Sequence, residues 1–266
     1  MIFVDAHVHI YDCFDSTFLW DSALANFEAA ARHLGDEPIS SAILLLAESS
    51  GVNWFRRFSR TEDSFPPPVC PPWSVQETRE SDSLIIRKVG KPPLTVIAGR
   101  QIVTKEKLEV LALATDSHFE EGLSLEETVA RIAERNGLPV IPWGAGKWAG
   151  QRGQQLKKLI ARETRPRLFL GDNGGRPRGW PRSSIFTEAE KRGIPILPGS
   201  DPLPIPSGAG RPGAFGFYLH ETIRAEYGAQ DLKEILLEPM TKIHPYGRLE
   251  TPYGFIRNQT LIRLAR

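Results

Sequence analysis

This chain has few cysteines, no large excess of charge of one sign and no long apolar runs. The two cysteines, Cys13 and Cys70, do not form a CxxC pair, which excludes a disulfide framework for a chain of this length and favours a reducing compartment. The 33 basic and 32 acidic side chains leave a formal net charge of +1. No general electrostatic field is therefore available to attract nucleic acid or an anionic membrane.

The apolar runs are short as well. None approaches the roughly 20 residues that span a bilayer, and the first residues enter a strand pattern without a signal-like stretch. We therefore expect a cytoplasmic protein that binds a small-molecule substrate, without nucleic-acid or membrane partners. Its oligomeric state is left open by the sequence.

What the chain does have is an alternation of short apolar runs with helical periodicity. Over residues 1–266 this pattern predicts a single α/β domain, built as a distorted TIM-like (β/α)7 barrel with a C-terminal hairpin around TPYG. The predicted strands are 2–7, 41–47, 94–99, 108–114, 138–142, 167–171 and 194–198, with a further short one at Ile85-Ile86. The predicted helices are 20–34, 124–136, 150–163, 184–192 and 230–238.

Two loops interrupt this rhythm. Residues 65–73, FPPPVCPPW, contain five prolines and predict a stiff extended segment. Residues 198–213 are rich in Pro and Gly and directly follow a predicted strand. Because the loops after the strands form the active face of a barrel, residues 198–213 are expected at the functional site.

The opening stretch VDAHVH contains the clearest chemical pattern. His7 and His9 are two residues apart at the end of a predicted strand, so their side chains point to the same face. A Ser-Asp pair ending at Asp201 follows the last predicted strand. Two imidazoles and one carboxylate suffice to bind a catalytic divalent ion and leave positions for water. Strand-end histidines bonded to backbone carbonyls are the alternative.

Five segments together resemble the PHP phosphoesterase-like and amidohydrolase-like metal-dependent barrels. VDAHVH is similar to their D-x-H-x-H opening, and four later segments are similar to PHP motifs in the same order along residues 4–203. These segments are AGRQIVT (98–104), LEVLALAT (108–115), LPVIPWGAGKW (138–148) and LPGSDPL (197–203).

The chain departs from this family at several ligand positions. Gln101 stands where the family has Glu, and Trp143 and Leu203 stand where it has His, which argues against a three-metal centre. The resemblance instead implies one divalent ion (Zn, Mn or Fe). The implied metal ligands are His7, His9, Glu109 and Asp201.

Glu109 occupies a family His position in an apolar strand, where a carboxylate requires a partner. That partner is either the metal or an arginine such as Arg100. Asp201 is expected to ligate the ion or to take a proton from its water. His118 follows the strand 108–114 and is either a catalytic acid or replacement ligand, or a solvated loop residue.

Further polar and aromatic residues follow predicted strands and are candidates for substrate binding. A helix N-terminus near Lys147 and Trp148 favours an anionic group, and an arginine can hold a phosphate or carboxylate with two bonds. Asp172 and Asn173 are expected to orient either the metal site or a substrate. The alternative for each candidate is an ordinary solvated loop residue or, for the aromatic ring, a packing role. The candidates are Lys147, Trp148, Asp172, Asn173 and Arg176.

These observations predict a metal-dependent hydrolase that acts on a small-molecule phosphoester or a C–N or C–O bond through a metal-activated water. The substituted ligand positions keep a second interpretation open. On that interpretation the chain is a catalytically degenerate PHP-like barrel that binds or senses a ligand.

Overall fold

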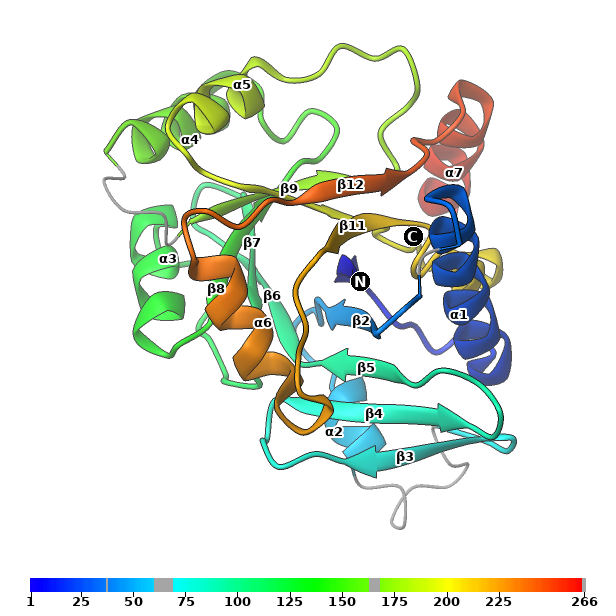
Figure 1. Cartoon of the computed structure of the whole chain (residues 1–266). Coiled ribbons are helices and arrows are strands. Elements are labelled where there is room, and N and C mark those ends of the chain that lie inside the picture. The colour runs from blue at the N-terminus through cyan, green and yellow to red at the C-terminus, as the bar shows by residue number, and fades with distance from the viewer. Residues whose placement is uncertain (37, 60–68, 163–167, 265–266) are drawn as a thin grey trace.

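The computed structural model describes residues 1–36, 38–59, 69–162 and 168–264 and contains two mixed β-sheets flanked by helices (Figure 1). The larger sheet has seven strands, in the order β12 (His244–Gly247), β11 (Phe215–Leu219), β1 (Ile2–Val8), β2 (Ser41–Leu46), β5 (Leu94–Ile97), β4 (Ser83–Lys88) and β3 (Trp73–Glu77). The smaller has five, in the order β10 (Ile196–Gly199), β9 (Phe169–Asn173), β8 (Leu138–Pro142), β7 (Glu109–Leu113) and β6 (Gly99–Val103).

The helices lie mainly on two sides of these sheets. Helices α1 and α7 lie on one side of the molecule, and α3, α4 and α5 lie on the other (Figure 1). The helices are α1 (Ser16–His33), α2 (Trp54–Ser59), α3 (Leu125–Glu134), α4 (Gly150–Arg162), α5 (Ser184–Lys191), α6 (Gly228–Leu237) and α7 (Pro252–Leu264), with the 3₁₀ turns η2 (Pro206–Gly210) and η3 (Ala225–Tyr227). Among the described residues, no helix is long and apolar enough to cross a membrane.

The predicted TIM-like (β/α)7 barrel is wrong. Strand β1 pairs with β2 on one edge and with the antiparallel β11 on the other, so the edge that β10 would need in a closed barrel is already occupied. Strand β7 also runs antiparallel to both of its neighbours, β6 and β8, whereas a TIM barrel is parallel throughout. The described strands therefore form two sheets that pack together without closing.

The predicted strand 94–99 divides at Ala98, where the chain passes from one sheet to the other. Strand β5 ends at Ile97 and β6 begins at Gly99. A β-carbon at Gly99 would lie 2.1 Å from the Leu46 carbonyl oxygen, so only glycine permits this close crossing over β2. A continuous apolar run thus contributes to two different sheets.

Local signals predicted the helices well. Ser124 accepts a hydrogen bond from the Glu127 amide and begins α3, as its capping sequence indicates. The tail, by contrast, is not a hairpin, because the TPYG segment starts helix α7 instead. Of the proline-rich loop 65–73, residues 65–68 lie outside the described part of the chain.

Strand β1 is buried on both faces and therefore lies at the centre of the fold. Ile2 and Val4 pack between the two sheets, whereas Phe3 packs in the cluster that includes α1. The pairing register with β2 shifts between Asp5 and Val8. Such irregularities redirect side chains near functional sites, and this one immediately precedes the two histidines.

Candidate metal centre

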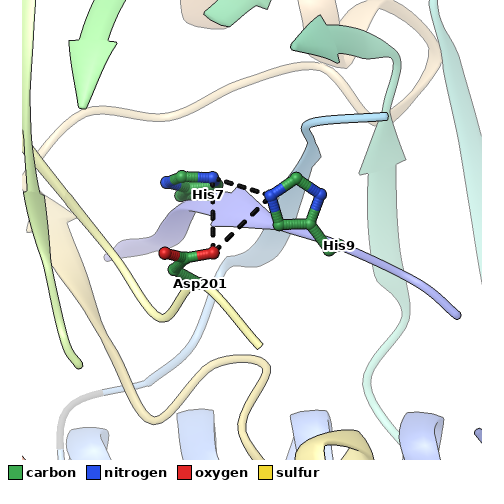
Figure 2. A group of neighbouring side chains, drawn as sticks. All are labelled: His7, His9 and Asp201. Carbon is green, nitrogen blue, oxygen red and sulfur yellow. Dashed lines mark hydrogen bonds and ion pairs between the residues drawn. The ribbon is translucent and has the colours of Figure 1, made fainter. Parts of the chain in front are cut away.

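Three side chains converge where β1 leaves the larger sheet. The Nε2 atoms of His7 and His9 lie 3.0 Å apart, and Oδ1 of Asp201 lies 3.6 Å from the first and 3.5 Å from the second. Figure 2 shows both imidazoles and the carboxylate directed toward one another. We call these three residues the His-His-Asp site.

The backbone fixes this convergence. Asp201 follows β10 with a φ of 48°, a left-handed conformation that is costly for a residue other than glycine. Its amide donates a 2.8 Å hydrogen bond to the His7 carbonyl. A β-carbon at Gly199 would lie 2.4 Å from the His7 backbone nitrogen, so this glycine allows β10 to approach β1 closely.

Asp5, on β1, stabilises the same contact between β1 and β10 through hydrogen bonds. Its fully buried carboxylate accepts backbone hydrogen bonds from His7 at 3.2 Å, Ser200 at 2.8 Å and Gly213 at 2.8 Å. Burial raises the pKa of Asp5 to about 6, although these hydrogen bonds act to lower it. Asp5 thus joins β1 to the loop that carries Asp201, and it is one of the residues that positions the site.

The ionisation states suit metal binding. Burial, and then the neighbouring His7, lower the pKa of His9 to about 4, so His9 is neutral at pH 7 and its lone pair is available to a metal. Burial acts to raise the pKa of Asp201, but His7, His9 and the Asn173 hydrogen bond outweigh it and hold that pKa below its usual value. Asp201 is therefore ionised.

The spacing of the three ligand atoms fits a single cation. Bonds of about 2.0–2.1 Å in a tetrahedral arrangement place ligand atoms roughly 3.3 Å apart, close to the 3.0 to 3.6 Å separations found here. Among the described residues, this is the one cluster of three or more potential metal ligands. Three protein ligands leave a coordination position for water, which is typical of catalytic rather than structural zinc.

Asn173, which was expected to orient either the metal site or a substrate, contacts the Asp201 carboxylate. Its side-chain nitrogen donates to Oδ2 of Asp201, which leaves Oδ1 facing the imidazoles. The side-chain oxygen Oδ1 of Asn173 accepts a 2.6 Å hydrogen bond from the Gly175 amide. Both the oxygen and the nitrogen of this side-chain amide are therefore held by hydrogen bonds. Hydrogen bonds of this kind orient metal ligands.

Glu109, a predicted metal ligand, is bound to Lys147, which was itself predicted to bind substrate. The side-chain partner of Glu109 is thus Lys147 and not Arg100, and the role of Glu109 as a metal ligand stays a prediction. Arg100 is bound elsewhere, to Glu48 at 2.7 Å and to Asp116 at 2.6 Å. The charge of Lys147 still acts on both His9 and Asp201, so the Glu109–Lys147 pair borders the site.

Two other candidates, His118 and Trp148, have their contacts elsewhere. The His118 backbone oxygen accepts a bond from Arg135, and its side chain lines a separate hollow together with Phe119. Trp148 packs against Phe186 with ring centroids 4.9 Å apart in the core beneath the smaller sheet.

Asp172 and Arg176 form a closed pair. Two bonds, of 3.2 and 3.0 Å, join the guanidinium of Arg176 to both carboxylate oxygens. Arg176 is buried, and this pair uses two of its N–H donors. The pair holds the turn after β9 in place.

A cavity of about 460 Å³ opens beside the site, with Asp201 in its wall. Trp143 and Leu203, which replace family ligands, line this cavity, so apolar surface stands where the resemblance would place further ligands. Gln101 contacts His9. The full lining is Trp143, Gly144, Ala145, Lys147, Asn173, Gly175, Ser200, Asp201, Leu203, Ile205, Ser207, Gly208, Arg211, Glu250, Phe255, Arg257, Asn258 and Gln259.

Sequence reasoning missed several residues at this site. The Tyr11 ring lies 5.8 Å from the His9 ring, centroid to centroid, and is tilted by 34° relative to it. Burial, together with the charges of Asp201 and Glu109, raises the pKa of Tyr11. Arg211, Phe255 and Arg257 enter the cavity from η2 and α7. Only the position of Tyr11, two residues after His9, was a signal available in the sequence.

No family model matches the chain, and no curated protein matches it by sequence. Among solved structures, it is similar to PsfC from Pseudomonas syringae PB-5123, with 14% identity over 99% of this chain and 98% of that chain and a TM-score of 0.55. The lesion-specific endonuclease PfuEndoQ from Pyrococcus furiosus matches with 12% identity over 91% of this chain and 57% of that chain, at a TM-score of 0.48. At this identity, the similarity to PsfC concerns the fold alone.

Proposed function

We propose that the protein is a hydrolase that uses one divalent ion, Zn, Mn or Fe, to cleave a phosphoester or a C–N or C–O bond in a small molecule. The observation that carries this proposal is the meeting of three ligand atoms, from His7, His9 and Asp201, one of which, Asp201, also lines a cavity. A cavity of about 460 Å³ is within the usual range for small-molecule sites.

The chain's own residues divide the work in this proposal. His7 and His9 would hold the ion as neutral imidazoles, and Asp201 would hold it through Oδ1. A divalent ion bound there would lower the pKa of its water to roughly 7. Because Asp201 is ionised with a depressed pKa, it is a better ligand than proton acceptor. Lys147, which pairs with Glu109, lines the same cavity.

Metal titration is the direct test. Purified protein should bind one equivalent of Zn or Mn by elemental analysis and gain thermal stability as the ion is added. His9→Ala should abolish both effects. His220→Ala is the matched control, because His220 is an exposed histidine in a separate cluster with Tyr218 and His244. Equal metal binding by both variants would contradict the proposal.

Turnover is tested separately. The metal-loaded protein should hydrolyse members of a panel of chromogenic phosphoesters, esters and amides, and Asp201→Ala should remove that activity. The second candidate function, a ligand-binding protein without turnover, is favoured by the apolar residues Trp143 and Leu203 at family ligand positions. Metal binding with no hydrolysis of any panel member, together with ligand affinity that is unchanged in His7→Ala, would support it instead.

A further inference from the structure

We propose that the ligand of this cavity carries a second acidic group, separate from the group at the metal, and that Arg211 and Arg257 bind it. The inference rests on the proposed function only for the group at the His-His-Asp site. Arg211 and Arg257 line the same cavity as Asp201, although they come from η2 and α7. The ligand class is therefore a small molecule with acidic groups at two ends.

Helix α7, which lines part of the cavity, is held in place by contacts at and near its N-terminus. The Glu250 amide donates to the carbonyls of Gly174 and Arg176 at 3.0 and 3.1 Å, which joins the start of the tail to the turn after β9. Phe255 packs against Trp180 at 5.5 Å between ring centroids. This anchoring places Arg257 at a defined wall of the cavity rather than on a loose tail.

The guanidinium donors at this wall are largely unused. Arg257 donates to the Asn258 side chain at 3.4 Å and has no carboxylate partner among the residues that the structure describes. Arg211 reaches Glu250 only at 4.0 Å, beyond hydrogen-bond distance. Lys147, in contrast, is occupied by Glu109.

Glu250 forms only a long ion pair with Arg211, at 4.0 Å, and none with Arg257 among the described residues. Its oxygens accept bonds from the Thr251 amide at 2.8 Å and from the Asn258 side chain at 3.4 Å, so it is directed mainly to the start of α7. An arginine in a cavity that lacks a bound carboxylate is suited to a planar anion such as a carboxylate or phosphate. Two arginines from separate elements form a pocket for such a group.

The remaining lining adds apolar surface to the cavity. Trp143 and Phe255 present rings, and Leu203 and Ile205 present aliphatic surface to the cavity. Trp180 bridges the two rings, with centroids 6.4 Å from Trp143 and 5.5 Å from Phe255. Apolar walls in the same cavity favour a short carbon spacer in the ligand.

Two acids of equal chain length provide the test. Calorimetry would measure the binding of succinate, which has two carboxylates, and of butyrate, which has one, to the Mn-loaded and the metal-free protein. Succinate should bind the loaded protein about tenfold more tightly than butyrate. Arg257→Gln and Arg211→Gln should each remove that preference and leave butyrate binding unchanged.

Arg87→Gln is the control, because Arg87 lies on β4 and is bonded to Gln76. Equal binding of the two acids, no binding of either, or the same loss in the control would overturn the inference while metal binding stands. If the protein binds no metal but still binds succinate in a way that depends on the two arginines, the proposed function is overturned and the second anion site is supported. Circular dichroism would confirm that each variant folds, and the two arginine variants provide independent measurements.

Discussion

The side-chain nitrogen of Asn173 donates a hydrogen bond to Oδ2 of Asp201, which joins the last residue of β9 to the turn after β10. This bond holds the carboxylate with its other oxygen toward the imidazoles. Asn173→Ala should therefore weaken metal binding by about 10- to 100-fold, as is usual for groups that orient ligands. Metal titration measures the change, with Gln155→Ala on the exposed face of α4 as the control amide. Equal affinity in the two variants would show that Asp201 needs no such support.

Gly199 permits the contact between β10 and β1. Gly199→Ala would place a β-carbon 2.4 Å from the His7 backbone nitrogen and should force the strands apart, at a cost of about 1–3 kcal/mol in the free energy of unfolding. Metal affinity should fall in parallel because His7 moves away from Asp201. Gly210→Ala is the control, since its β-carbon would meet Phe18 at an ordinary 3.6 Å. Urea denaturation and metal titration of both variants test this.

Arg100 forms ion pairs with two carboxylates, those of Glu48 and Asp116. Its guanidinium bonds Glu48 and Asp116, and Glu48 is only 4% exposed. Arg100→Met would leave that buried carboxylate without its cation and should lower the free energy of unfolding by about 3–5 kcal/mol. Arg56→Met, which removes a half-exposed partner of Asp116, should cost under about 1 kcal/mol. Similar losses in the two variants would contradict the assignment.

Asp231 provides a pH-dependent contribution to stability. Hydrogen bonds from the Arg224 side chain, at 2.5 and 3.1 Å, lower the pKa of Asp231 below its usual 3.8. The unfolded chain therefore binds a proton at higher pH than the native protein does. The stabilisation should be fully present above about pH 4 and be lost as the pH falls through the folded pKa.

Comparison of wild type with Asp231→Asn by urea denaturation at several pH values measures this effect. The wild type should be the more stable at neutral pH, and the difference should shrink in acid. Asp12→Asn is the control, because Asp12 is 91% exposed and its contact with Arg57 is 3.4 Å. A difference for Asp231→Asn that does not change with pH would exclude an ionic origin.

Local signals in the sequence determined the elements far better than their assembly. Capping at Ser124 and the apolar runs gave most helices and strands, since these depend on neighbouring residues alone. The barrel prediction failed because β11 occupies the free edge of β1. That pairing joins Ile2 to Leu219, a choice between long-range partners that no local pattern encodes. The start of α7 at Pro252 was missed for another reason: Thr251 caps it by accepting a bond from the Gly254 amide at 3.0 Å, and this local signal of Thr before Pro was read as part of a hairpin.

The prediction of the site depended on the same distinction. The histidines His7 and His9 lie two apart on one strand, so strand geometry alone brought them to one face. Asp201 joined them through its position after a strand, and the structure brings these three groups together. The site residues remain predictions as metal ligands. The Lys147–Glu109 pair and the arginines of η2 and α7 arise from tertiary contacts between distant segments, which the sequence pattern did not reveal.

The three candidate ligands come from different sheets, with His7 and His9 on the β1 side and Asp201 after β10. An ion bound by all three would cross-link the two layers, so its binding free energy would add directly to their cohesion, by about 2.7 kcal/mol at a hundredfold excess over Kd. Chelation should then appear first as faster amide hydrogen exchange where β1 and β10 meet, with each layer still intact. In such an arrangement, the contact between the two sheets becomes more rigid as more of the protein binds the ion.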